Sequence, residues 1–157
     1  MPRIISIVRQ IPALAGWRFL VAIAPKQKWA GVTICDVSKR DDIAMRRATQ
    51  DILAALALLR EQKPKLFRRV QAHVSCVALA DIPDPFHYYS VSRLCLLRHE
   101  AKSHPADTGA LNELVATLAD AGTFAYLASK NVTMSKWAVR IAALLSRQRE
   151  SKIGAKA

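Results

Sequence analysis

The chain has no acidic residue before Asp36, and glycines, cysteines and aromatic residues are few throughout. Its 157 residues include 5 glycines and no serine-rich or glutamine-rich tract, so disorder is not expected outside the chain ends. The 3 cysteines are Cys35, Cys76 and Cys95, and none belongs to a C-x-x-C pair. Each lies in an apolar run, which is typical of unpaired core thiols or a reducing compartment. A disulfide between Cys76 and Cys95 is the alternative, if they face each other across paired strands.

The residues that are present favour one folded domain with a positive surface. Hydrophobic residues make up 52% of the chain, enough to bury a core within a single domain, 1–157, that has a frayed tail at 150–157. The net charge is +12, from 24 Lys and Arg against 12 Asp and Glu. This charge favours nucleic acid, another polyanion or an anionic membrane surface as the partner, and it names no activity.

Residues 1–25 form an apolar, acid-free segment with more than one interpretation. Within residues 4–25, Arg9 and Arg18 interrupt apolar stretches that are shorter than the roughly 20 residues of a membrane-spanning helix. The segment is therefore either a membrane-interface or targeting segment, or an opening helix followed by a core strand. Residues 17–24 fit a buried strand or the second half of a helix. We expect a cytoplasmic protein, with residues 4–25 available for membrane association.

Helical periodicity is present in three further segments. Apolar residues at helical spacing predict a helix over residues 40–61, capped near Ser38 and Asp41 and ended by Pro64. A second helix is predicted from Asp107 to Asn131, and a third from residue 133 to residue 149. The last two helices follow each other at once, so we expect them to pack as a C-terminal helical hairpin.

Alternating patterns predict strands between these helices. The segment GVTICDV places Val32 and Ile34 on one side of a strand. Residues 70–80 and 91–97 are predicted to pair in antiparallel fashion, with residues 86–89 near their connection. The predicted fold class is α+β: a small antiparallel sheet with three or four helices.

No motif in the chain matches a known catalytic or metal-binding pattern. G-x-S-x-G, G-x-G-x-x-G and P-loop motifs are absent, so no catalytic residue and no cofactor are assigned. His99 and His104 are separated by five positions, rather than the four of H-E-x-x-H, and this spacing places them on different helical faces. The segment RHEAKSHP is therefore predicted to be a loop without a metal. A hydrolase whose unrecognised ligands include His73, His87, His99 and His104 is the least favoured hypothesis.

Basic residues beside the apolar stripes are candidates for a polyanion-binding surface. The candidates are Arg68, Arg69, Lys136, Arg140 and Arg147. Reading single-stranded nucleic acid usually requires exposed aromatic side chains as well, for which Tyr88 and Tyr89 are the candidate pair. No recognised binding module accompanies the charge, so a surface that serves solubility alone is the simpler interpretation.

Four segments carry a resemblance to a known family: KPKLFRRVQAHVSCVALAD, YYSVSRLCLL, TLADAGTFAYL and TMSKWAVRIA. From Leu53 onward, their order resembles that of small bacterial zincin-like metallopeptidases. In that family a helix, a basic turn and a paired-strand region precede a motif helix with H-E-A-T-H-A-R, and a helix with R-I-E follows. The resemblance implies that TLADAGTFAYL corresponds to the motif helix.

The residues at the motif positions differ from those of the family. Asp120 stands in place of the first histidine, Ala121 in place of the catalytic glutamate and Phe124 in place of the second histidine. Ala142 falls where R-I-E would supply the third ligand. A lone aspartate cannot hold zinc. The resemblance therefore implies a non-catalytic, zincin-like domain that acts through binding, and the charge alone suggests the alternative of a basic nucleic-acid-associated protein.

Overall fold

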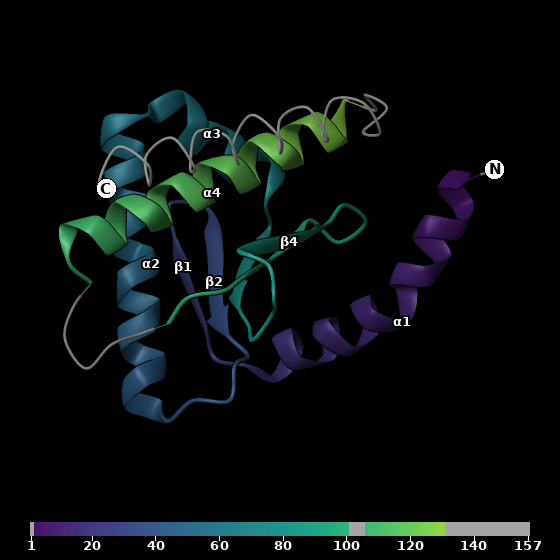
Figure 1. Ribbon diagram of the computed structural model, residues 1–157, viewed down its shortest axis with the longest axis horizontal. Coiled ribbons are helices and arrows are strands. Elements are labelled where there is room, and N and C mark those ends of the chain that lie inside the picture. The colour runs from purple at the N-terminus through teal and green to yellow at the C-terminus, as the bar shows by residue number, and fades with distance from the viewer. Residues whose placement is uncertain (1, 101–105, 131–157) are drawn as a thin grey trace, which may run out of the picture.

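The computed structural model describes residues 2–100 and 106–130, which form four helices and one five-stranded sheet (Figure 1). In chain order the elements are α1 (Pro2–Ile23), β1 (Lys26–Trp29), β2 (Val32–Asp36), α2 (Asp42–Gln62), α3 (Pro64–His73), β3 (Cys76–Leu79), β4 (Phe86–Tyr89), β5 (Leu94–Leu97) and α4 (Thr108–Ser129). The strand order is β1-β2-β3-β5-β4. The α+β class is confirmed. The second helix of the predicted hairpin lies outside the described residues.

Alternate residues of each central strand point to opposite faces of the sheet. Both faces are buried, because a cluster of apolar side chains packs against each of them. Val32 and Ile34 of β2 face the main core, where they pack with α2, α3 and α4. Cys35 of β2 faces a smaller cluster on the other side, to which α1 contributes Leu14 and Trp17. In Figure 1, α1 leaves this side of the sheet and extends away from the other helices.

The hairpin between β1 and β2 depends on two residues with positive φ. Ala30 has φ 46° and Gly31 has φ 83°, which is the pattern of a tight turn that matches the twist of antiparallel strands. Strand β1 has the sequence KQKW and is mostly exposed at the edge of the sheet. Its polar residues do not alternate with apolar ones, so periodicity did not predict it.

Helix α2 confirms the helix predicted over residues 40–61. Its cap is Asp41, whose Oδ1 accepts a hydrogen bond of 2.8 Å from the Ala44 amide. Pro64 does follow the helix, but it also begins α3, since a proline in the first turn lacks an amide that would be unpaired there anyway. The strand predicted from residue 70 is therefore wrong as far as His73, where α3 ends.

Strands β3 and β5 are neighbours, as predicted, but they run parallel rather than antiparallel. The direction of β5 is reversed because β4 precedes it. The sequence pattern predicts a connection, and not a strand, at these residues. β4 is the other edge strand and pairs antiparallel with β5 alone, so the β4–β5 hairpin returns the chain in the direction of β3. The sheet is therefore mixed, with β2, β3 and β5 parallel in its centre.

The predicted alternative of a Cys76–Cys95 disulfide is wrong. Cys76 is opposite Leu94 in the register, and Cys95 is opposite Val77, so the two thiols point to opposite faces of the sheet. The close pair is Cys35 and Cys76, whose Sγ atoms lie 3.8 Å apart. The three cysteines are free and buried, in agreement with the prediction of core thiols.

The N-terminal segment is a helix up to Ile23, so residues 17–24 are not a buried strand. Within residues 2–100 and 106–130, none of the helices combines the length and the apolar character that crossing a bilayer requires. Phe19 and Ile23 of α1 are 66% and 65% exposed. The helix therefore keeps part of its apolar surface outside the core.

Candidate functional site

Three motif positions of the zincin-like resemblance, Asp120, Ala121 and Phe124, lie on α4, which begins at an Asp107 cap as predicted. Asp120 is half-buried and Ala121 is buried. The ring of Phe124 packs edge to face against Phe86 and Tyr88 of the edge strand β4, with ring centroids 6.0 and 6.2 Å apart. Aromatic side chains therefore fill the space between α4 and β4 at this point.

These residues do not fit a zinc ion. An alanine methyl group and a phenylalanine ring offer no ligand atoms, whereas zinc in proteins is held by Cys, His or carboxylate groups. Among residues 2–100 and 106–130, no three His, Cys, Asp or Glu side chains lie close enough to hold a metal ion. Ala142, the position of the third family ligand, is outside the described residues.

The histidines of the hydrolase hypothesis are separated. His73 ends α3, His87 lies in β4 and His99 follows β5. Their side chains also contact different residues, which are Tyr126, Tyr89 and Asp51, respectively. His104 lies outside the described residues. The three histidines that the structure places therefore form no common ligand set.

A basic surface covers the outer side of α3 and the ends of the elements next to it. On α3, Lys65 and Arg68 are exposed and Arg69 is half-buried. Arg93, in the turn after β4, donates hydrogen bonds to the carbonyl groups of the last turn of α3. We call the following residues the α3 basic surface: Lys65, Arg68, Arg69, Arg93 and Lys130. Of the other predicted polyanion-binding residues, Lys136, Arg140 and Arg147 lie outside the described residues.

Tyr126 of α4 links the basic side chains to one another. The Arg69 guanidinium lies 4.8 Å from the centre of the Tyr126 ring, and the Lys130 ammonium lies 5.7 Å from it. Cations at these distances are attracted to the face of an aromatic ring. Arg69 also donates a hydrogen bond of 3.4 Å to the Thr123 hydroxyl. Arg69 is thus held in place, whereas Arg68 is exposed.

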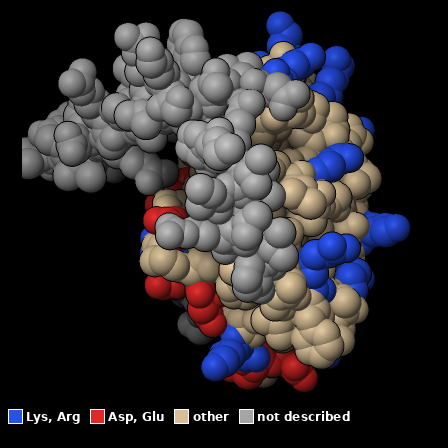
Figure 2. All heavy atoms as spheres, turned by 90° about the vertical axis from the view of Figure 1, so that its right-hand side faces the viewer, with Lys and Arg blue, Asp and Glu red and all other residues tan. Residues whose placement is uncertain are grey.

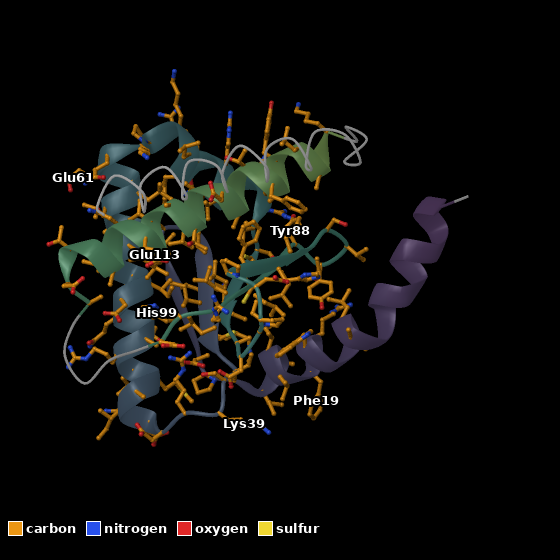
Figure 3. The ribbon with its side chains drawn as sticks, viewed as in Figure 1. Phe19, Lys39, Glu61, Tyr88, His99 and Glu113 are labelled. Carbon is orange, nitrogen blue, oxygen red and sulfur yellow. The ribbon has the colours of Figure 1, made fainter. Side chains whose placement is uncertain are left out.

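Only one tyrosine of the predicted pair lies near this surface. The Tyr88 hydroxyl donates a hydrogen bond of 2.8 Å to the His73 carbonyl, and burial raises the pKa of Tyr88. Figure 3 shows Tyr88 between β4 and α4. Tyr89 is 6% exposed and packs in the cluster on the α1 side of the sheet, so the prediction of an exposed pair is wrong.

Charge is distributed unevenly over the face that Figure 2 shows. In Figure 2, Lys and Arg side chains stand out along the top and right edge, and Asp and Glu gather at the lower left and the bottom. Helix α3 has the sequence PKLFRRVQAH and contains no acidic residue. In contrast, Asp36, Asp81 and Glu100 lie at the carboxyl ends of β2, β3 and β5 or just beyond them. Arg40 and Arg98 lie at this same end, so it carries charges of both signs, whereas α3 is basic alone.

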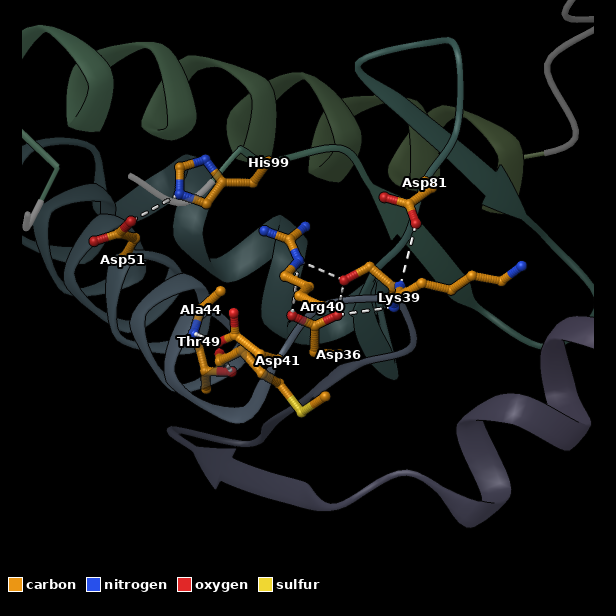
Figure 4. A network of polar contacts seen from close by, with 11 residues as sticks. Asp36, Lys39, Arg40, Asp41, Ala44, Thr49, Asp51, Asp81 and His99 are labelled. Carbon is orange, nitrogen blue, oxygen red and sulfur yellow. Dashed lines mark hydrogen bonds and ion pairs between the residues drawn. The ribbon is translucent and has the colours of Figure 1, made fainter. Parts of the chain in front are cut away.

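A polar network occupies the carboxyl ends of these strands (Figure 4). Asp36 ends β2 and is 5% exposed. Its Oδ1 accepts hydrogen bonds from the Ser38 amide, at 2.9 Å, and from the Ser38 hydroxyl, and its Oδ2 lies 3.3 Å from Arg40 Nε. Arg40 Nε also donates to the Ser38 hydroxyl. The buried carboxylate therefore holds the base of the Arg40 guanidinium.

His99 joins this end of the sheet to α2. Its Nε2 lies 2.8 Å from Oδ2 of Asp51, and Asp51 is 5% exposed. Oδ1 of Asp51 accepts a hydrogen bond of 3.3 Å from the Ala106 amide, just before α4. The pair fixes the orientation of the imidazole and leaves Nδ1 for another partner.

No motif in the sequence indicates this network, although the chain holds one signal for it. Asp51 stands in the inward stripe of α2 between Ala48 and Ile52, where a charged residue is costly unless it is paired. The partner could not be identified, because His99 is 48 positions away. Ser38, expected near the cap of α2, is bonded to Asp36 instead.

In comparisons with known proteins, no family model, no curated protein and no solved structure matches this chain.

Proposed function

We propose that this protein is a zincin-like domain without a catalytic metal, and that it acts by binding nucleic acid through the α3 basic surface. The observation that carries the proposal is the placement of Lys65, Arg68 and Arg69 on one acid-free helix beside Tyr126. The zincin-like part rests on the resemblance of the four segments. The absence of a catalytic metal is supported by Phe124, which packs against aromatic residues at the position of a family ligand.

The chemistry of the α3 basic surface suits a phosphate backbone. Exposed Lys and Arg side chains neutralise phosphates and release counterions, which is the main source of affinity in non-specific nucleic-acid binding. Arg69 is ordered by Tyr126 and Thr123, so less side-chain entropy is lost when it contacts a phosphate. The half-buried ring of Tyr126 lies beside these basic side chains and holds the Arg69 guanidinium near its centre.

The test is fluorescence anisotropy with labelled single-stranded and duplex DNA over a range of salt concentrations. We expect the logarithm of the binding constant to fall linearly with the logarithm of the salt concentration. The double variant Lys65→Ala/Arg68→Ala should reduce this slope by about 1.4 to 1.8 units, at about 0.7 to 0.9 per lost phosphate contact. Both side chains are exposed, so folding should be retained.

The matched control is Lys39→Ala/Arg46→Ala, which removes the same charge from exposed positions outside α3. The control should bind with the slope of the parent protein. Equal losses in both variants would mean that net charge alone attracts the nucleic acid. Absence of binding by the parent protein at low salt would remove the nucleic-acid proposal.

Elemental analysis of the purified protein tests the zincin-like part separately. We expect no stoichiometric zinc, because Ala121 and Phe124 provide no ligand atoms. One tightly bound zinc per chain that is lost on substitution of a histidine would contradict the absence of a catalytic metal, and it would favour the hydrolase alternative.

Helix α1 supports a second candidate, association with an anionic membrane surface. Phe19 and Ile23 are one helical turn apart and mostly exposed, and Arg18 beside them is exposed as well. Figure 3 shows Phe19 on the side of α1 that faces away from the sheet. Exposed apolar and basic side chains on one helix are the combination that binds anionic lipid interfaces.

Vesicle flotation tests this second candidate. The parent protein should float with vesicles that contain phosphatidylserine and not with pure phosphatidylcholine vesicles. The variant Phe19→Ser/Ile23→Ser should lose this binding, whereas Val91→Ser, at another exposed apolar position, should keep it. Equal flotation of the parent protein and the Phe19→Ser/Ile23→Ser variant would rule out α1 as the membrane contact.

A further inference from the structure

A groove of about 550 Å³ opens beside the polar network at the carboxyl ends of β2, β3 and β5. Its charged or titratable lining residues are Arg40, Asp81, Arg98, His99 and Glu100. In sheets with parallel strands, ligands commonly bind in the crevice outside the carboxyl ends. The position and the polar lining of this groove therefore suggest a binding site that is separate from the α3 basic surface.

Arg40 is the anchor of this site. Its Nε is engaged by Asp36 and Ser38, and its side chain is 14% exposed. Within the described part of the chain, its two terminal nitrogens have no hydrogen-bond partner, and Figure 4 shows the guanidinium directed toward the side of His99. A planar guanidinium that is held at its base presents two parallel donors, which match the two oxygens of a carboxylate or phosphate.

The buried groups beneath Arg40 show that the arrangement is built rather than incidental. Asp36 is a carboxylate that is almost fully buried, and such a group is costly unless it is paired and hydrogen-bonded. Asp51 is equally buried and holds His99. Both carboxylates thus orient a nitrogen-bearing side chain that lines the groove.

The rim of the groove carries negative charge as well. Asp81 and Glu100 are exposed and line the groove together with the two arginines, so these charges balance. Arg98 is bonded through Nη1 to the Pro83 carbonyl and fixes the loop that carries Asp81. A balanced rim disfavours a polyanion, and it favours a ligand with one negative and one positive group.

We propose that this groove binds a small zwitterionic molecule, an amino acid or an aminoalkyl phosphate. Arg40 binds the carboxylate or phosphate group, and His99 lies beside it. Asp81 and Glu100 bind the ammonium group. The shared chemistry is an oxyanion and an ammonium group on one small molecule.

NMR titration of the full, ¹⁵N-labelled chain tests the proposal with four probes: L-alanine, L-glutamine, L-glutamate and O-phosphoethanolamine. At least one probe should produce saturable shifts at the amides of residues 40–44, 81–82 and 98–100. Acetate and ethylammonium, which carry one charge each, should bind at least about tenfold more weakly than that probe. A preference for O-phosphoethanolamine over the amino acids would identify the oxyanion as phosphate.

Two variants test whether Arg40 and Glu100 bind the ligand, and a third variant is the control. Arg40→Lys keeps a positive charge for Asp36 but loses the planar pair of donors, so affinity should fall at least about tenfold. Glu100→Gln changes an exposed residue and should weaken the zwitterions without weakening acetate. Glu113→Gln, an exposed position on α4, is the control and should bind like the parent protein.

The proposal is overturned if none of the probes causes saturable shifts at these amides, or if Glu100→Gln binds the zwitterions as tightly as the parent protein. Equal affinity of the Arg40→Lys variant would exclude Arg40 as the anchor. Shifts of the same amides by an oligonucleotide, at concentrations where the zwitterions have no effect, would assign the groove to nucleic acid instead.

Discussion

The substitution Gly122→Ala in α4 tests the packing of α3 against α4, on which the basic surface depends. A Cβ atom at this position would lie 2.6 Å from Val70 Cγ2, 3.1 Å from the Val70 amide nitrogen and 3.3 Å from Val70 Cα. The first distance is shorter than real contacts between carbon atoms allow. The two helices approach this closely because residue 122 has no side chain. Gly122→Ala should therefore force α3 and α4 apart.

Two opposing effects decide the magnitude. Replacing a glycine by alanine inside a helix stabilises the helix by about 1 kcal/mol. An extra methyl group in a well-packed core typically costs about 1 to 3 kcal/mol. Here the cost should be near the upper end, because two of the three close atoms of Val70 belong to the backbone and cannot rotate away. We expect a net loss of about 2 kcal/mol in the free energy of unfolding.

Urea unfolding followed by circular dichroism measures this loss as a lower midpoint at unchanged slope. The control is Gly16→Ala in α1, where nothing lies within 4 Å of the added methyl group. This control should unfold at the same urea concentration as the parent protein or at a higher one. Adding Val70→Ala to Gly122→Ala removes the Cγ2 contact and should make the two losses less than additive.

A Gly122→Ala protein that is as stable as the parent protein would refute the reasoning. It would mean that α3 and α4 do not approach each other at Val70. The positions of Arg69 and Tyr126 relative to each other would then be wrong as well. Strict additivity with Val70→Ala would lead to the same conclusion.

Three further predictions concern two buried groups, the Asp51 carboxylate and the Cys95 thiol. Asp51→Ala should lower the free energy of unfolding by about 1 to 3 kcal/mol, because it leaves the His99 ring and the Ala106 amide without their partner, and an unchanged urea midpoint would contradict this pair. Burial raises the pKa of Cys95 from 9.0 to about 12, so the native thiol should not react with a disulfide reagent at mildly alkaline pH until urea unfolds the chain. Because the unfolded chain loses this proton first, stability should fall as the pH rises from 9.0 to about 12, and Cys95→Ala should reduce that fall.

Several elements could be predicted from neighbouring residues alone. Helices α2 and α4 each begin after an aspartate that caps the first turn, and each carries an apolar stripe at helical spacing. Strand β2 follows from the alternation of Val32 and Ile34. Caps and stripes involve residues that are close in the chain, so their pattern can be read without the rest of the fold.

The edge strands and the strand directions could not be predicted in this way. Strands β1 and β4 have the polar or aromatic sequences KQKW and FHYY, because edge strands bury less of their surface. Without β4 in place, β3 and β5 were expected to run antiparallel. The alternation over residues 70–76 was also ambiguous, since Phe67, Val70 and Val74 fit the buried side of a helix end equally well.

The sequence by itself determined the α+β class and the main helices, because local periodicity carries that information. It also identified Arg68 and Arg69 as basic residues beside an apolar stripe. Only the tertiary structure decided that Arg69 stacks on Tyr126, that Tyr89 is buried and that Asp36 holds Arg40 beside a groove lined by His99. These arrangements join residues from different helices and strands. Their geometry depends on the direction of each strand and on the closure of long chain segments, which leave no periodic trace in the sequence.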